Sequence, residues 1–324
     1  MVEFLANYGL FLAKLLTVAV IVLAVAGFIV ASTRRGAHRD GLDVENLNKR
    51  FENLGDAVRR VVHGKEQFKK DSKGRRKGEK QLAKKGSQRQ RMFVLDFKGD
   101  IRASATASLR EEVSAVLAVA TKDDKVLVRL ENAGGAVHEH GLAASQLVRV
   151  KTHGIPLFVS VDKVAASGGY LMACVADRIM VAPFAIIGSI GVIAQLPNFH
   201  RLLEEKGVDF EQVTAGRYKR TLTMFGKNTD EGREKIKEEL EDVHELFKNQ
   251  ISEHRPQIDL EKVATGEHWY GARAMSLKLV DEIRTSDDFL LEATGDFDLY
   301  SISYKRRRSL PERLLAGVES LLSY

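Results

Sequence analysis

The chain has 324 residues, of which 44% are hydrophobic and 29% are charged, and this composition excludes wholesale disorder and collagen-like repeats. Its single cysteine, Cys174, excludes an intrachain disulfide framework and a cysteine-rich zinc module. The net charge is +6, but residues 33–92 hold 19 Lys and Arg against 8 Asp and Glu, a net charge of +11. The rest of the chain therefore carries −5. Because the positive charge is confined to one segment, no nucleic-acid partner is expected.

An apolar segment, Leu10–Ala31, lies near the start of the chain, and Lys14 is its only charge. A helix of these 22 residues, at ~1.5 Å per residue, matches a hydrocarbon core of ~30 Å. A cleaved signal peptide is the alternative, but the apolar run is longer than usual and Glu3 is the only charge before Lys14. We therefore expect an uncleaved transmembrane anchor over residues 1–32, in contact with membrane lipid.

Residues 33–91 are expected to form a basic pre-domain. Apolar residues recur at helical spacing over Leu42–Val62, which predicts an amphipathic helix. Lys69–Arg91 has almost no apolar residue and cannot bury enough surface to order itself, which predicts a tether. Residues 301–324 form a second amphipathic segment, a C-terminal tail that is a candidate for docking on a partner subunit.

Short apolar runs alternate with helical patterns from Met92 onward. The predicted strands are Met92–Phe97, Val126–Leu130, Pro156–Val161, Ile179–Ala182 and Phe210–Val213. The predicted helices are Ser108–Ala120, which begins with a Ser108/Glu111 capping box, then Val137–Lys151, Gly168–Cys174, Asp230–Arg255 and Tyr270–Val280. This alternation predicts an α/β fold with a mostly parallel sheet.

Three glycine-rich turns follow predicted strands or apolar runs. The first turn is Asn132–Gly135, the second is Ala166–Gly169 and the third is Gly188–Gly191. At the carboxyl ends of parallel strands such turns face the crevice where ligands bind, and their N–H groups suit an oxyanion or a phosphate. Phosphate is the weaker choice, because the chain has no P-loop sequence and no G-x-G-x-x-G after a strand.

Ser167 lies in the second turn between small residues, which exposes its hydroxyl group. The G-x-S-x-G sequence of many hydrolases is not present, since Ala165 replaces the first glycine, and a helix N-cap is the alternative role for such a serine. A nucleophilic serine needs a base, and the candidates are His200 and Lys219. A lysine is a base only when neutral, which requires burial, and residue type alone makes Lys219 a surface charge.

Two other histidines, His138 and His140, flank Glu139 just after the first turn. We expect both of them on the solvated start of a helix. No third ligand is evident nearby, so no metal site is predicted.

Four sequence features together resemble the signal peptide peptidase A family, a set of membrane-bound Ser/Lys proteases. They are the Gly134–Gly135 pair, Ser167–Tyr170, Gly188–Val192 and the Tyr218–Lys219 pair. The resemblance covers essentially the whole chain and is greatest to the SohB-type members, which have one catalytic domain, an N-terminal anchor and a basic pre-domain. The gap of 52 residues from Ser167 to Lys219 is the spacing of these members.

This similarity implies a role for each site residue. Ser167 is the nucleophile, Lys219 is the general base and acid, and Ser189 orients the lysine amine. The N–H groups of Gly134 and Ser167 form the oxyanion hole, and no cofactor is needed. Relatives often carry Ser-Pro where this chain has Asn132–Ala133, which implies a looser first turn here.

The resemblance also implies an architecture. Residues 92–300 are expected to adopt the Clp-protease/crotonase fold, a superhelix of ββα units, as the peptidase domain. Relatives assemble into dome- or ring-shaped homo-oligomers, and their serine and lysine can come from adjacent subunits.

These features predict a membrane-anchored serine endopeptidase that hydrolyses unfolded or membrane-derived peptides, signal peptide remnants and damaged proteins among them. Two alternatives remain: a catalytically weak membrane-bound scaffold on the same fold, and a crotonase-like acyl-CoA enzyme. The expected location is the bacterial inner membrane, with a single pass. The side stays open, because Arg34, Arg35 and Arg39 favour a cytoplasmic domain, whereas the supposed role of the family favours the opposite face.

Overall fold

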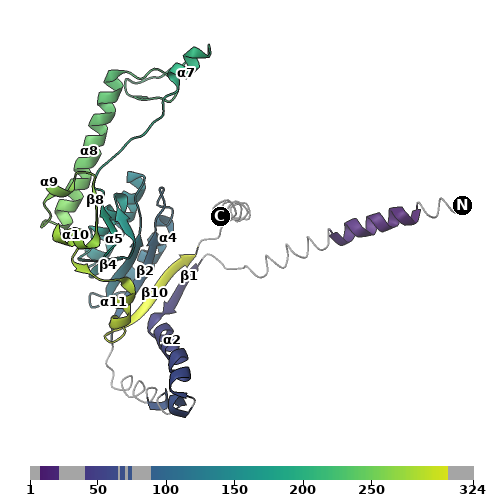
Figure 1. Cartoon of the computed structure of the whole chain (residues 1–324), viewed down its shortest axis with the longest axis vertical. Helices are drawn as coiled ribbons and strands as arrows, with labels where there is room; N and C mark the ends of the chain where they lie inside the picture. The colour runs from purple at the N-terminus through teal and green to yellow at the C-terminus, as the bar shows by residue number, and fades with distance from the viewer. Residues whose placement is uncertain (1–7, 22–40, 65, 70–71, 75–88, 306–324) are drawn as a thin grey trace. The chain divides into compact units, whose positions relative to one another are not determined.

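The computed structural model describes residues 8–21, 41–64, 66–69, 72–74 and 89–305 of the chain (Figure 1). The chain divides into two compact units, one of residues 42–304 and one of residues 1–41 with 305–324.

In the smaller unit, residues 8–21 are helical. Within the described ranges, no helix is long and apolar enough to cross a membrane. Residues 1–7 and 22–32 of the predicted anchor, and residues 306–324 of the predicted tail, lie outside the described residues.

A seven-stranded sheet forms the centre of the larger unit, in the order β1-β10-β2-β3-β4-β6-β9. Its strands are β1 (Gly41–Asn46), β2 (Gln90–Lys98), β3 (Lys125–Glu131), β4 (Leu157–Val161), β6 (Arg178–Val181), β9 (Glu282–Ile283) and β10 (Phe297–Lys305). All pairs from β10 to β9 are parallel. One register row crosses five strands through buried apolar residues: Ile302, Leu95, Val128, Val159 and Ile179. Both faces of the sheet are covered by helices, so side chains on both faces are buried. This explains why these strands appear as continuous apolar runs in the sequence.

Helices cover both faces of this sheet. One apolar cluster packs Leu95 and Val128 against α4 (Thr106–Leu117), α5 (Val137–Thr152), α6 (Gly168–Ala173) and the C-terminal half of α8 (Asp230–His254). The other packs Val94 and Leu127 against α2 (Leu47–Val62) and α11 (Ser286–Ala293). The predicted α/β class is therefore confirmed.

A second, three-stranded sheet has the order β5-β7-β8 and consists of β5 (Val164–Ala166), β7 (Ile186–Gly188) and β8 (His268–Tyr270). The first two strands are parallel and end at the second and third turns, respectively. Because they are paired in register, Ala166 against Gly188, the two turns lie side by side. The short helices α9 (Leu260–Val263) and α10 (Gly271–Ser276) flank β8 in the chain.

Figure 1 shows α8 extending away from the sheets, with α7 (His200–Glu205) near its outer end. The chain between β7 and α8 is mostly exposed. The strand predicted at Phe210–Val213 is wrong, because these four residues are exposed and have no strand partner among the described residues.

Two helix starts differ from prediction. The predicted helix over Leu42–Val62 begins only at Leu47, because the Asn46 side chain accepts from the Lys49 N–H at 2.9 Å and residues before it form β1. The capping box at Ser108 is wrong, since α4 starts two residues earlier after Ala105, which makes no side-chain cap.

Candidate active site

The second turn holds Ser167 in an uncommon backbone conformation, with φ 52° and ψ −120°. A residue with a Cβ atom is strained there, and such strain is concentrated at functional sites. The Ser167 side chain makes no helix-capping hydrogen bond with α6, which removes the ordinary reason for a serine at this position. A sharp strand-to-helix turn with a half-buried serine is the geometry of a nucleophile elbow.

Glycines after Ser167 allow this turn to pack closely. A Cβ atom on Gly168 would lie 2.5 Å from His140 Cγ, and one on Gly169 would lie 2.1 Å from the Asn132 carbonyl oxygen. Both positions therefore require glycine. The first turn is equally tight, since a Cβ atom on Gly134 would lie 2.7 Å from Ser167 Cβ. The first and second turns are thus in direct contact.

Two of the N–H groups in these turns are already hydrogen-bonded. The Gly134 N–H donates to Asn132 Oδ1 at 2.9 Å, and the Ser167 N–H donates to the Gly188 carbonyl oxygen at 2.7 Å. These are the two donors that the resemblance assigned to the oxyanion hole. In this structure both are occupied.

Two neighbouring N–H groups are free. Within the described part of the chain, neither the Gly135 N–H nor the Gly168 N–H has a hydrogen-bond partner. Both residues line the cavity beside Ser167. An N–H on the residue after a nucleophile, together with one from a facing loop, is the usual composition of an oxyanion hole on an elbow.

The replacement of Ser-Pro by Asn132–Ala133 does not leave the first turn open. The Asn132 side chain closes it through the bond to the Gly134 N–H, as an Asx-turn does. Asn132 itself is buried. The looser turn implied by the missing proline is therefore compensated by the asparagine.

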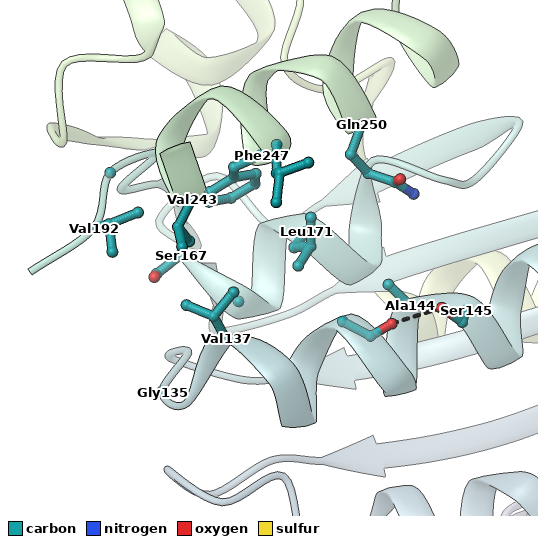
Figure 2. A pocket seen from close by; sticks show the side chains of 14 residues that line it. Gly135, Val137, Ala144, Ser145, Ser167, Leu171, Val192, Val243, Phe247 and Gln250 are labelled. Atoms are coloured by element: carbon teal, nitrogen blue, oxygen red, sulfur yellow. Dashed lines mark hydrogen bonds between the residues drawn. The ribbon is translucent and has the colours of Figure 1, made fainter. Parts of the chain in front are cut away.

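A cavity of about 360 Å³ opens beside the Ser167 hydroxyl (Figure 2). Its walls are mainly apolar, and Figure 2 shows Val137, Leu171, Val243 and Phe247 around it. The lining residues come from the three turns, α5, α6 and α8. A small or medium apolar side chain fits such a space.

Lys219 lies elsewhere in this chain. It is exposed, and its N–H donates to the Gly216 carbonyl oxygen at 3.2 Å. Its neighbour Arg217 bonds to Glu231 at 2.8 Å, at the outer end of α8. The cavity contacts the same helix from Val243 onward, and the rise along the helix from residue 231 to residue 243 is about 18 Å. A single chain does not bring Lys219 to Ser167.

Of the other two predicted residues, Ser189 lies near Ser167, whereas His200 lies in the outer segment with Lys219. Ser189 follows β7 in the third turn, is half-buried and has φ 52°. The residue before it, Gly188, supplies the carbonyl oxygen that accepts from the Ser167 N–H. His200 is the first residue of α7. The residue before it, Phe199, donates its main-chain N–H to the Met224 carbonyl oxygen, which places the start of α7 in the outer segment. The structure brings Ser167 and Ser189 together and leaves His200 at the outer end.

The expectation that His140 is solvated is wrong, whereas His138 is exposed as expected. His140 is fully buried, with Nδ1 at 2.9 Å from the Ala136 carbonyl oxygen and Nε2 at 3.2 Å from Asn132 Oδ1. Its spacing from Ala143, Ala144 and Leu147, all buried on one face of α5, is the signal that could have identified it.

Cys174, which directly follows α6, is not a competing nucleophile. Burial raises the pKa of the Cys174 thiol to about 12, so the thiolate does not form near neutral pH. The same helix is held in the core by Tyr170, whose hydroxyl donates to the Leu279 carbonyl oxygen at 2.8 Å. This support keeps the end of α6 that follows Ser167 in place.

Comparison with known proteins shows which family the chain belongs to. The sequence matches the family models Peptidase family S49 N-terminal over residues 3–147 and Peptidase family S49 over residues 149–299. It is similar to "Probable protease SohB" of Haemophilus influenzae, with 47% identity over 95% of this chain and 91% of that protein. "Probable protease SohB" of Buchnera aphidicola subsp. Acyrthosiphon pisum is 56% identical over 72% of this chain and 70% of that protein.

More distant similarities extend to a second curated protein and to solved structures. "Putative signal peptide peptidase SppA" of Enterococcus faecium is 29% identical over 51% of this chain and 48% of that protein. Among solved structures, the 1510-N membrane-bound stomatin-specific protease superposes with a TM-score of 0.42 at 14% identity, over 63% of this chain and 84% of that one. The resemblance found in the motifs is confirmed by the family matches and the SohB relatives: the chain belongs to peptidase family S49 and is a peptidase.

Proposed function

We propose that the protein is a membrane-anchored serine endopeptidase in which Ser167 is the nucleophile and Lys219 the base. The observation that carries the proposal is the strained Ser167 turn beside the N–H groups of Gly135 and Gly168, which have no partner among the described residues. A hydroxyl, two donors and an apolar cavity converge there, as acyl transfer requires.

The chemical steps use these groups in sequence. The Lys219 amine takes the hydroxyl proton as Ser167 Oγ attacks the scissile carbonyl carbon, and the oxyanion is bound by the Gly135 and Gly168 N–H groups. The protonated amine then gives its proton to the leaving nitrogen as the C–N bond breaks. Water attacks the acyl-enzyme with Lys219 again as base, and Ser167 is regenerated. Ser189 hydrogen-bonds the lysine amine and orients it.

We propose that the lysine comes from a neighbouring copy in a homo-oligomer. Two observations support this: Lys219 is exposed, and the segment that carries it displays large apolar side chains to solvent. Ile193 is 79% exposed and Val213 is 97% exposed, and Leu202 and Val208 are also exposed. An apolar surface of this kind is typical of a protein–protein contact. Burial against a second copy would also desolvate the amine and favour its neutral form.

The apolar cavity supports substrates with small or medium apolar side chains next to the cleaved bond, as in unfolded and membrane-derived peptides. We infer that residues 1–32 anchor the protein in the bacterial inner membrane by one pass. The boundaries expected at residues 91 and 300 shift, because β1 and α2 of the predicted pre-domain and residues 301–305 of the predicted tail belong to the central sheet or pack on it. The larger unit, residues 42–304, then carries the Clp-protease/crotonase type of fold.

Hydrolysis of a fluorogenic peptide by the full-length protein in detergent micelles tests the proposal. Ser167→Ala should lower the rate by at least about 1000-fold. Ser145→Ala is the matched control, because Ser145 also lines the cavity but bonds only to the Gly141 carbonyl oxygen. A fluorophosphonate should label the wild type and not Ser167→Ala. Full activity in Ser167→Ala would reject the proposal, whereas labelling without turnover would favour the scaffold alternative.

A further inference from the structure

A buried histidine lies directly beneath the two turns of the candidate active site. His140 on α5 has no exposed surface, and the backbone of Gly168 packs against its ring, where a Cβ atom would lie 2.5 Å from Cγ. The residue does not line the cavity, so it does not touch the substrate. Its effect on the site must pass through other groups.

The histidine is connected to the first turn by one side chain. His140 Nε2 lies 3.2 Å from Asn132 Oδ1, and the same oxygen accepts from the Gly134 N–H at 2.9 Å. The backbone N–H only donates, so it fixes the orientation of the Asn132 amide and leaves Oδ1 facing the ring. The other ring nitrogen, Nδ1, also faces an oxygen, the Ala136 carbonyl at 2.9 Å, and a neutral ring carries one hydrogen only. The Ala136 carbonyl already accepts from the His140 main-chain N–H at 3.1 Å, so we assign the ring hydrogen to Nε2, where it donates to Asn132 Oδ1.

The first turn needs such support because of its composition. Gly134 has φ 93° and Gly135 has φ 152°, and two consecutive glycines at positive φ have wide conformational freedom. An oxyanion donor must be held within about 0.5 Å of its productive position. Main-chain bonds to Val164 and Ala166 hold Asn132 itself. Beyond Asn132, the described hydrogen bonds that hold the turn are the one from the Gly134 N–H to the Asn132 side chain and the one from the Ala136 N–H to the Ile101 carbonyl oxygen at 2.8 Å.

We propose that His140 is a positioning residue for the oxyanion hole. Through Asn132 it holds the turn that presents the Gly135 N–H, and by direct packing it supports the backbone of Gly168. One buried ring thus positions both donors of the oxyanion hole. This inference depends on the proposed peptidase function, and it assigns a role that is not in the Ser/Lys chemistry itself.

Two substitutions separate hydrogen bonding from packing. His140→Leu keeps an apolar volume of similar size and removes the donor to Asn132. His140→Gln keeps an N–H close to the position of Nε2. The matched control is His153→Leu, because His153 is exposed at the opposite end of α5 and bonds only to the Arg149 carbonyl oxygen.

We expect His140→Leu to lower kcat about 10- to 100-fold, with KM changed less than about twofold, because a misplaced donor weakens only the transition state. A peptide aldehyde, which forms a tetrahedral adduct with Ser167, should bind more weakly by the same factor. His140→Gln should stay within about threefold of wild type in both measurements, and His153→Leu should match wild type.

A second arm covers the case in which His140→Leu fails to fold. Asn132→Ala should give the same selective loss of kcat and of aldehyde affinity. In the double variant with His140→Leu, if it folds, the losses should not add, because both act on one turn. Thermal unfolding and the size of the assembly are measured for every variant.

The outcomes are distinguishable. Inactivity of the wild type on all peptides overturns the proposed function and this inference with it. An active wild type with inactive Ser167→Ala, combined with unchanged kcat in folded His140→Leu or Asn132→Ala, overturns the role of His140 alone. Equal losses in His140→Leu and His140→Gln would also contradict it, because the donor would then be irrelevant.

Discussion

The N–H of Ser167 donates to the carbonyl oxygen of Gly188 at 2.7 Å, so the second and third turns are joined by a main-chain hydrogen bond. This bond follows from the parallel pairing of β5 with β7, in which Ala166 and Gly188 are partners. It brings Ser189 next to Ser167, the proposed nucleophile. It also removes the Ser167 N–H from the set of free donors.

Ser189→Ala should lower kcat about 10-fold and leave Ser167 reactive. In the proposed mechanism the Ser189 hydroxyl orients the lysine amine, and the substitution removes this hydroxyl without changing the backbone. Steady-state kinetics with a fluorogenic peptide measures the effect. The Ser145→Ala variant described above is the control. A rate equal to wild type would show that Ser189 does not orient the base.

Gly135→Ala should abolish most of the activity. Its Cβ atom would lie 2.2 Å from the Ile101 carbonyl oxygen, so the turn has to move and its N–H with it. Loss of one oxyanion donor typically costs about 100- to 1000-fold in kcat. The measurement is kcat per active site, counted by fluorophosphonate labelling. A decrease in kcat of less than about fivefold would indicate that Gly135 does not supply a donor.

Val243→Phe should change substrate preference, because a larger side chain from α8 would fill part of the cavity. The value of kcat/KM for a peptide with leucine at the cleaved bond should fall about 10-fold or more relative to the peptide with alanine there. Competition between the two peptides in one reaction gives the ratio directly. An unchanged ratio would place the substrate side chain outside this cavity.

Glu112 should make stability depend on pH. It is buried in α4, where burial raises the pKa of its carboxyl group to about 7 although the Tyr304 N–H donates to it at 2.7 Å. A carboxyl group whose pKa is raised by folding is favourable when protonated, so its contribution is complete at low pH and is lost as the pH rises through about 7.

Glu112→Gln removes this dependence and can keep the bond to Tyr304. We expect its free energy of unfolding to exceed that of wild type by about 1–3 kcal/mol at pH 8 and to be nearly equal at pH 5. Urea denaturation at both pH values checks this. A variant less stable than wild type at pH 8 would contradict the account of the buried carboxyl group.

The sequence predicts the centre of the fold well. The strands β2, β3 and β4 are located within two residues, because buried parallel strands appear as uninterrupted apolar runs. The second turn is also identifiable, since a serine followed by two glycines after an apolar run allows a sharp change from strand to helix. Ser167 was therefore predictable as a candidate from local chemistry.

Other features depend on contacts between distant segments. Asn132 closes its turn through a side-chain bond, and His140 is buried because α5 packs beneath the second turn. The capping box at Ser108 is a local preference that tertiary packing of α4 overrides. Which N–H groups remain free depends on the pairing of β5 and β7, and residue types alone do not specify it.

The most direct test of the central claim is the co-expression of two inactive chains, one with Ser167→Ala and one with Lys219→Ala. If the serine and the lysine of one site come from adjacent copies, mixed assemblies should regain about a quarter of the wild-type activity, since one chain supplies each group. Each variant alone should be inactive. Mixed assemblies without activity, or full activity in Lys219→Ala alone, would contradict this account.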